Sequence, residues 1–279
     1  MSNRVITFTT DFGSADAYLA AMKGVALGIV PDLTLVDITH EVPPQDIAHG
    51  AFVLGSAYQY FPVDTVHVAV VDPGVGTRRK AVLVVSPTGS FVGPDNGVLS
   101  YVLKDYMTFD QVQFKSTEFA RPVVITVPSD CQVYELTNPE YWHHPVSSTF
   151  HGRDIFAPVA AHLASGVQQE NVGESIQELV FLNLFTLRRS DDRVEGEVIY
   201  IDRFGNLVSN IQKDSLPDRE IVIELAGVTI SGLSRTFSDA DSLLALIGSH
   251  GYLEVAGNRG SAARRLGVEV GATLTVRRR

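Results

Sequence analysis

Four short segments of the chain carry side chains of catalytic type. The first, Asp72–Arg79, directly follows an almost wholly apolar run and places one carboxylate and two guanidinium groups on a rigid, glycine-containing turn. An arginine close to Asp72 would keep that carboxylate ionised and hold its own charge in place, which suits an active site. The segment lacks the Gly-Lys-Ser/Thr ending of a phosphate-binding P-loop. Taken alone, it is better explained as an ordinary turn with a surface ion pair.

The second segment, Ser147–Asp154, contains His151 at the entrance to a predicted helix. An imidazole at that position lies near backbone donors and can be neutral and chemically useful. Ser148 and His151 could in principle serve a serine hydrolase, but the chain has no G-x-S-x-G nucleophile elbow. Neither H-E-x-x-H nor paired cysteines occur, so we expect no zinc site and no other metal centre.

The third segment is Thr10–Gly13, with Asp16 shortly after it. Asp11 lies in a strand-to-helix loop, where a carboxylate can bind a ribose diol or cap the helix. For Asp11 alone, capping is the favoured interpretation. The letters D-F-G also mark the metal-binding segment of protein kinases, but only ten residues precede Asp11 here, too few for the kinase motifs that come earlier. A kinase is therefore excluded.

The fourth segment, Ile201–Asn206, lies in the second half of the chain and is joined by Gly248–Tyr252. Phe204 and Asn206 place an aromatic ring beside an amide. This pair suits a purine, because the ring can stack and the amide can both donate and accept hydrogen bonds. A β-turn with a core phenylalanine is the alternative, and the sequence leaves it open.

Alternating strands and helices predict how the first three segments are positioned. Parallel strands whose ends carry loops bring ligand-binding residues together at one edge of a sheet. We therefore expect an α/β fold with a mostly parallel sheet flanked by helices on both faces. The periodicity predicts strands over 5–9, 33–38, 66–71, 81–85 and 90–92, helices over 17–29, 46–60, 96–103 and 153–163, and a loop over 138–148.

The pattern of residues changes after Leu187, where the polar run 188–193 begins. Beyond it, short β-prone segments are separated by Gly, Asp or Asn turns, which predicts a smaller antiparallel barrel or sandwich. The expected strands cover 198–201, 221–225, 228–230, 252–255 and 273–276. We therefore expect an N-terminal α/β domain over 1–187 and a C-terminal β domain over 188–279.

Composition narrows the class of protein. The chain has 279 residues, 45% of them hydrophobic and 19% charged, which fits a globular protein with a sizeable core and excludes disorder as its main state. A formal net charge of -10 disfavours nucleic-acid binding. Cys131 is the only cysteine, so no internal disulfide can form. The segment Met1–Thr10 has no apolar signal region, and we expect no membrane span and a cytoplasmic location.

Taken in order, the motifs resemble one family, the S-adenosyl-L-methionine (SAM) hydrolases, also called SAM hydroxide adenosyltransferases, which are related to fluorinating and chlorinating enzymes. One such motif would be weak evidence, but the ordered set covers nearly the whole chain. The motifs are T-D-F-G at 10–13, P-P-Q-D-I at 43–47, D-P-G-V-G-T-x-R at 72–79, G-P-D-N-G at 93–97, F-H-G-R-D at 150–154, F-G-N at 204–206 and G-Y-L-E-V-A from 251.

The resemblance implies hydrolysis of SAM to adenosine and L-methionine, with SAM as substrate and no cofactor. It also implies a homotrimer whose ligand lies between one subunit's first domain and a neighbour's second. The family's catalytic triad falls on Asp72, Arg79 and His151. The implied substrate contacts are Asp11 to the ribose hydroxyls, Asp16 and Asp202 to the methionine ammonium, Ser249 to its carboxylate, and Asn206 with Phe204 to the adenine.

Some positions depart from the halogenating relatives, which have a tyrosine at the place of Asp72, a serine at Gly152 and, in the fluorinating enzymes, a tryptophan at Gln45. These differences argue against a halide pocket. His250 replaces the relatives' arginine beside Ser249, which weakens the expected grip on the substrate carboxylate. The alternatives are a SAM or nucleoside sensor without turnover, a halide-dependent 5′-halo-adenosine synthase, and a generic phosphatase or esterase.

Overall fold

The computed structural model describes residues 4–107, 120–217, 220–239 and 242–279, so the segment Met1–Thr10 is described only from Arg4. The chain forms two compact units: the first holds residues 4–107 and 122–182, and the second holds residues 120–121 together with the described residues from 183 to 279. The expected domain boundary at residue 188 stays a prediction.

The first unit is built on a seven-stranded mixed sheet, which confirms the predicted α/β class. Strands β2, β1, β3 and β5 pair in parallel, whereas β5, β4, β7 and β8 pair antiparallel. The sheet therefore has more antiparallel pairing than the sequence suggested. In sheet order the strands are β2 (Thr34–Thr39), β1 (Val5–Thr10), β3 (Val66–Val70), β5 (Gly89–Pro94), β4 (Ala81–Ser86), β7 (Gln132–Glu135) and β8 (Glu174–Ser175).

Local sequence explains the change of direction. Only Pro87 and Thr88 separate β4 from β5, and a two-residue connection can join antiparallel neighbours but not parallel ones. A separate two-stranded sheet pairs β6 (Pro122–Thr126) with β9 (Glu178–Leu182). Neither of these two strands was predicted from the periodicity.

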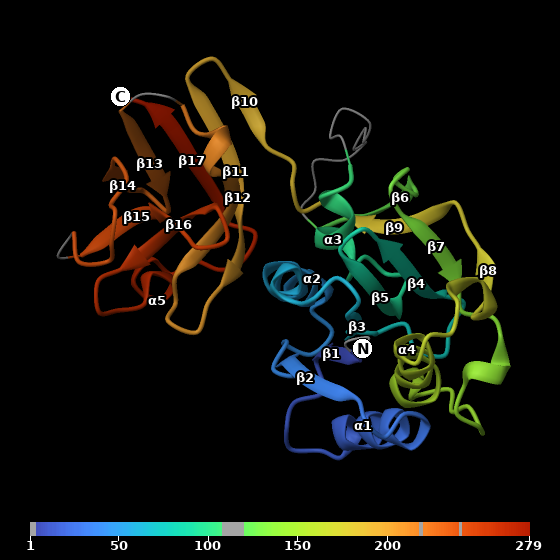
Figure 1. The fold of residues 1–279 in the computed structure, drawn as a ribbon. Coiled ribbons are helices and arrows are strands. Elements are labelled where there is room, and N and C mark those ends of the chain that lie inside the picture. Colours follow the sequence, from blue (N-terminus) through green and yellow to red (C-terminus); the bar gives the residue numbers. More distant parts are fainter. Residues whose placement is uncertain (1–3, 108–119, 218–219, 240–241) are drawn as a thin grey trace. The chain divides into compact units, whose positions relative to one another are not determined.

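Helices cover both faces of the sheet, as predicted (Figure 1). Helices α1 (Tyr18–Ile29) and α4 (Ala157–Ala164) pack together on one face, and α2 (Ile47–Ala57) and α3 (Ser100–Lys104) cover the other. Asp46 caps α2, since its Oδ1 accepts a hydrogen bond from the backbone of His49 at 2.9 Å. The short helical turns are η1 (Tyr58–Tyr60), η3 (Pro139–Tyr141), η4 (Gly152–Phe156), η5 (Gln169–Asn171) and, in the second unit, η6 (Lys213–Ser215).

The predicted helix over 153–163 begins as a π-helix. The turn η4 covers Gly152–Phe156, and the backbone N–H of Ala157 bonds the carbonyl of Gly152, five residues earlier. Helix α4 continues from there as a regular α-helix. The buried side chains of Phe156 and Val159 pack with Phe8 and Val68 of the sheet in the main apolar core of this unit.

A neutral histidine is built into the opposite face of this sheet. His67 lies on β3 with none of its surface exposed, stacks on Phe91 with a ring separation of 4.9 Å, and contacts the Thr7 hydroxyl through Nδ1 at 2.8 Å. Burial lowers the pKa of His67 from 6.5 to about 4. The imidazole is therefore uncharged in the folded protein at neutral pH.

We expect His67 to make the free energy of unfolding depend on pH between about 6.5 and 4. In this window the unfolded chain binds a proton at this side chain and the folded chain does not, so stability falls as the pH falls, by about 3 kcal/mol over the window. His67→Phe keeps an aromatic ring beside Phe91 and removes the titration. Urea unfolding of both proteins from pH 7 to pH 4 measures the difference. Equal pH slopes for the two proteins would contradict the expectation.

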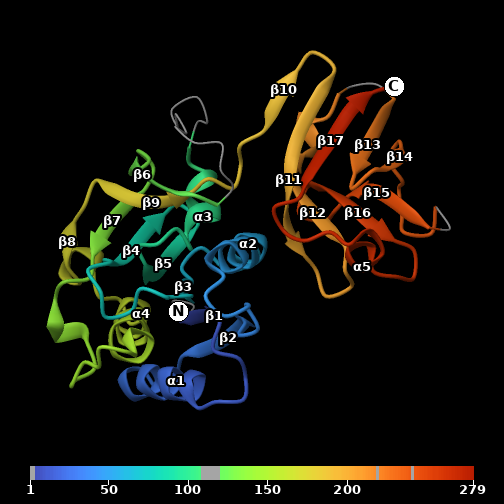
Figure 2. The same ribbon diagram turned by 180° about the vertical axis from the view of Figure 1, so that it is seen from behind.

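The second unit is an eight-stranded, entirely antiparallel sheet that curls into a nearly closed barrel, confirming the predicted β class (Figure 2). The path ends in β14 and β15, which contact each other. The elements are β10 (Arg188–Ser190), β11 (Arg193–Ile201), β12 (Leu207–Gln212), β13 (Ile221–Leu225), β14 (Val228–Ser231), β15 (Leu243–Ile247), β16 (Tyr252–Gly257), α5 (Ala262–Leu266) and β17 (Thr273–Arg278). Within the described residues of both units, no helix is long and apolar enough to cross a membrane.

Candidate active site

The Asp72–Arg79 loop is a tightly folded connection between β3 and β4. Strand β3 ends at Val70, so Asp72 stands just past the carboxyl end of a buried parallel strand. The Thr77 hydroxyl donates to the carbonyl of Gly74 at 2.7 Å and accepts from the backbone N–H of Arg79 at 3.3 Å. Gly76 has φ of 75°, and a Cβ there would lie 2.2 Å from the carbonyl oxygen of Ser148. The loop therefore presses directly against the segment that carries His151.

Within this loop Arg79 and Asp72 form a forked ion pair. Arg79 Nε donates to Oδ1 and Oδ2 of Asp72 at 2.9 and 3.0 Å, and Nη2 donates to Oδ2 at 2.5 Å. The two side chains are only 10% and 5% exposed, respectively. The ion pair is buried, which replaces the surface ion pair that the segment alone suggested.

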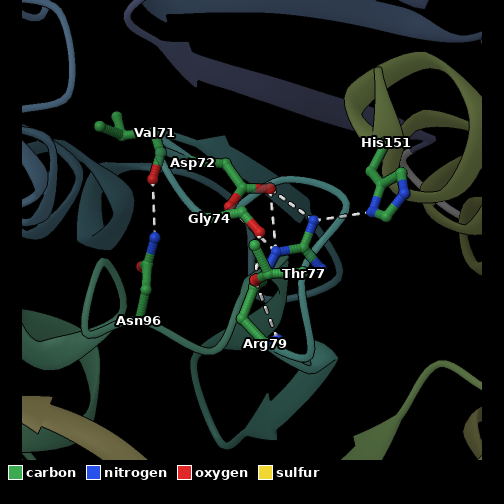
Figure 3. A network of polar contacts seen from close by, with 7 residues as sticks. All are labelled: Val71, Asp72, Gly74, Thr77, Arg79, Asn96 and His151. Atoms are coloured by element: carbon green, nitrogen blue, oxygen red, sulfur yellow. Dashed lines mark hydrogen bonds and ion pairs between the residues drawn. The ribbon is translucent and has the colours of Figure 1, made fainter. Parts of the chain in front are cut away.

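His151 completes a chain of three polar side chains (Figure 3). Its Nδ1 lies 2.8 Å from Nη2 of Arg79. A guanidinium can only donate, so Nδ1 of His151 is the acceptor and any ring proton is on Nε2. Burial and the nearby Arg79 charge lower the pKa of His151, against smaller opposite effects of Asp72 and Asp154. The structure thus brings Asp72, Arg79 and His151 together, with the imidazole neutral at neutral pH.

A cavity of about 630 Å³ opens beside this chain of residues. Asp72 and His151 line it together with Asp11, whose Oδ2 accepts from the backbone N–H of Gln45 at 2.7 Å. The remaining wall is mostly apolar and aromatic and includes Phe12, Tyr18, Pro44, Val75 and Phe150. Asp16 is exposed and is not among the residues that line this cavity.

Sequence reasoning missed His40, which fixes the loop that carries Asp11. The His40 carbonyl accepts from the backbone N–H of Gly13 at 2.7 Å, and its Nδ1 lies 2.9 Å from the Thr10 hydroxyl. On the other side of the ring, Nε2 lies 3.1 Å from Oδ1 of Asp37. No motif or spacing in the sequence links His40 to Thr10, because the contact depends on the pairing of β1 with β2.

The other predicted site residues line a cavity of about 920 Å³ in the second unit. Asp202, Phe204, Asn206 and Ser249 all contribute to it. Asp202 Oδ2 accepts from Nδ2 of Asn206 at 2.8 Å, and its Oδ1 accepts from the backbone N–H groups of Phe204 and Asn206 at 2.9 and 2.8 Å. Phe204 is 77% exposed, so the alternative of a core phenylalanine is wrong, and the ring is free to stack on a ligand.

Beside Ser249, His250 is paired with a buried carboxylate. Nε2 of His250 lies 2.6 Å from Oε1 of Glu254, whose side chain is only 9% exposed. Glu254 also lines the cavity of the second unit, and sequence reasoning did not single it out. Across the described parts of both units, no group of three or more His, Cys, Asp or Glu side chains is arranged to hold a metal ion.

Fold and site together define an α/β protein with an additional β-barrel unit. At a strand end of the first unit, a buried Asp-Arg ion pair and a half-buried histidine can orient a small polar molecule such as water. The chain belongs to the SAM hydroxide adenosyltransferase family: residues 6–173 match the model of the N-terminal domain of that family, and residues 196–275 match the C-terminal domain.

Individual relatives support this assignment. An (R)-S-adenosyl-L-methionine hydrolase of Salinispora arenicola is 38% identical, with 97% of each chain covered. A fluorinase of Nocardia brasiliensis is 28% identical, with 98% of this chain and 96% of the relative covered. Among solved structures, an uncharacterised conserved protein of Thermotoga maritima has a TM-score of 0.84 and 34% identity, covering 98% of this chain and all of that one.

Proposed function

We propose that the protein hydrolyses SAM to adenosine and L-methionine. The observation that carries the proposal is the hydrogen-bonded chain of Asp72, Arg79 and His151, which borders a cavity in a member of the SAM hydroxide adenosyltransferase family. The identity of 38% to a named SAM hydrolase, against 28% to a fluorinase, supports the hydrolytic branch. Asp72 supports it as well, because the halogenating relatives have a tyrosine at that position.

The chemistry needs little more than a well-placed water. The oxygen of water forms a bond to the 5′ carbon of SAM while the bond from that carbon to sulfur breaks. The electron pair of the broken bond stays on the sulfur, so methionine leaves as a neutral thioether. The leaving group therefore needs no acid. Holding a nucleophile in line within a site that excludes bulk water can contribute about 7–11 kcal/mol, more than a single general base usually adds.

In this scheme Arg79 and His151 hold the attacking water or hydroxide, and Asp72 orients them. With Nδ1 of His151 occupied by Arg79, the neutral imidazole presents an Nε2–H donor, which suits the oxygen of the nucleophile. The forked pairing with Asp72 fixes the plane of the guanidinium. The proton of the water leaves to solvent or to a neighbouring group.

The remaining residues are assigned to the substrate. Asp11 binds the ribose hydroxyls, Asp16 and Asp202 the ammonium group, Ser249 the carboxylate, and Asn206 with Phe204 the adenine. Of these substrate-binding candidates, Asp11 lines the cavity of the first unit, and Asp202, Phe204, Asn206 and Ser249 line the cavity of the second, whereas Asp16 is exposed and lines neither. Following the family resemblance, we propose a homotrimer in which the substrate lies between the first unit of one subunit and the second unit of a neighbour. We also propose that the protein acts in the cytoplasm. Light scattering from the purified chain tests the trimer.

Product analysis tests the proposed reaction. Incubation of the purified protein with SAM in halide-free buffer should release adenosine and methionine in equal amounts, as measured by chromatography. Added chloride should produce no new nucleoside, whereas a 5′-chloro product would indicate a halide-dependent synthase. SAM that binds in calorimetry without any adenosine release would indicate a sensor and would overturn the proposal.

A further inference from the structure

The turn Asp95–Gly97, which follows β5 and precedes α3, contacts both ends of the Asp72–Arg79 loop. Nδ2 of Asn96 donates to the carbonyl of Val71, the residue directly before Asp72, at 2.8 Å (Figure 3). The backbone N–H of Asp95 donates to the carbonyl of Lys80, the residue directly after Arg79, at 2.9 Å. One turn thus holds the backbone on both sides of the ion pair.

The orientation of the Asn96 amide is defined by its second hydrogen bond. Oδ1 accepts from the backbone N–H of Val98 at 3.1 Å, so a flipped amide would face a donor with its NH₂ group and a carbonyl with its oxygen. Strand β3 ends at Val70, and the Val71 carbonyl therefore lies beyond the strand. The side chain of Asn96 supplies a donor to this carbonyl where the strand pairing has stopped.

The turn itself is anchored to the rest of the unit. Oδ1 of Asp95 accepts from the backbone N–H of Val180, on β9, at 2.8 Å. Gly97 has φ of 97°, and a Cβ there would lie 2.5 Å from Cγ of Leu182, which leaves no room for a side chain. The turn that holds the Val71 carbonyl is therefore itself fixed, through Asp95 and Gly97, to strand β9.

We propose that Asn96 is a positioning residue for the catalytic ion pair: by holding the Val71 carbonyl it sets the direction in which Asp72 leaves the strand, and through Asp72 the place of Arg79. Asn96 is not among the residues that line the cavity of the first unit. For its activity readout this inference rests on the proposed function. A misplacement of about 1 Å in a catalytic group can reduce a rate by about a hundredfold.

A matched pair of variants tests the inference. Asn138 makes the same two kinds of bond at the same lengths, with Nδ2 to the carbonyl of Asn171 at 2.8 Å and Oδ1 from the backbone of Glu140 at 3.1 Å, in a loop that does not line the cavity. We expect Asn96→Ala to lower kcat by at least tenfold with little change in KM, and Asn138→Ala to leave kcat within twofold. Asn96→Asp, which keeps the acceptor and replaces the donor, should be as impaired as Asn96→Ala.

Thermal unfolding separates positioning from stability. If Asn96→Ala lowers Tm no more than Asn138→Ala does and still loses kcat, the positioning role holds. If Asn96→Ala keeps kcat within twofold of the parent, or if Asn96→Asp is fully active, the inference is wrong.

A readout without substrate distinguishes this failure from a failure of the proposed function. NMR titration of His151 reports its contact with Arg79, among the charges of Arg79, Asp72 and Asp154 that surround it. In Asn96→Ala the pKa of His151 should rise toward its ordinary value, because Arg79 is less well placed, and in Asn138→Ala it should stay unchanged. If the parent protein releases no adenosine, this titration still decides whether Asn96 positions the ion pair. An unchanged His151 pKa in Asn96→Ala would overturn the inference.

Discussion

Alanine in place of Arg79 should reduce kcat for adenosine release by about a thousandfold, within the range expected for loss of a positioned polar group in a transition state. Arg79 makes the contacts to both other members of the cluster, with Nη2 shared between Oδ2 of Asp72 and Nδ1 of His151. Its removal therefore frees the carboxylate and the imidazole at once. A chromatographic assay of adenosine at saturating SAM measures the effect.

The same substitution should also destabilise the fold. Asp72 would be left as a buried carboxylate without its partner, a change that typically costs about 3–5 kcal/mol. Activity must therefore be measured on protein shown by circular dichroism to be folded. Arg79→Lys is the matched control, since it keeps the positive charge and loses the forked geometry, and it should recover stability better than rate. Folded Arg79→Ala with kcat within threefold of the parent would contradict the assignment.

His151→Ala should lower kcat by about a hundredfold and should remove the acid side of the pH profile. In the parent protein burial and the Arg79 charge lower the pKa of His151, so the neutral form predominates at neutral pH. Protonation turns Nδ1 into a donor that faces the guanidinium, and the contact at 2.8 Å is lost. The value of kcat/KM should therefore fall as the pH falls below the ordinary histidine range.

Rate measurements from pH 8 to pH 4.5 on both proteins check this expectation. His162 offers a matched control, because burial lowers its pKa too, while it packs against Tyr141 and does not line the cavity of the first unit. We expect His162→Ala to keep the acid limb of the parent. A parent enzyme that loses activity as the pH rises through 6.5, or a His151→Ala variant that retains the limb, would refute the role of the neutral imidazole.

The buried strands and the place of Asp72 just past one of them could be predicted from the sequence, because both depend on local patterns. The apolar run that ends at Val70 predicts a buried strand, and residues just past such a strand lie at the ligand-binding edge of a sheet. This rule alone marks Asp72 as a candidate site residue. The convergence of Arg79 and His151, 72 residues apart in the sequence, came from the family resemblance and not from any local signal.

The features that were missed depend on contacts between distant segments. Strand β7 pairs antiparallel with β4 near one edge of the sheet. The residues of the two strands do not indicate which strand each will pair with. The contact of His40 with Thr10 follows from the pairing of β1 with β2. Glu254 is buried beside His250, although carboxylates usually face solvent, and the residues of its own strand do not indicate this burial. The catalytic and substrate-binding roles assigned to the site residues all stay predictions.

The π-helical turn at Gly152–Phe156 makes the number of residues in that segment as important as their identity. A π turn takes more residues than an α turn, and each residue of an α-helix advances the chain by about 100° around its axis. If the segment lost one residue and closed into a regular α-helix, α4 could keep its packing on the sheet only by swinging His151 about a quarter-turn away from Arg79. Loop grafts and chimeras between relatives must therefore preserve the length between Phe150 and Ala157 as well as His151 itself, even where the other side chains in between are exchanged.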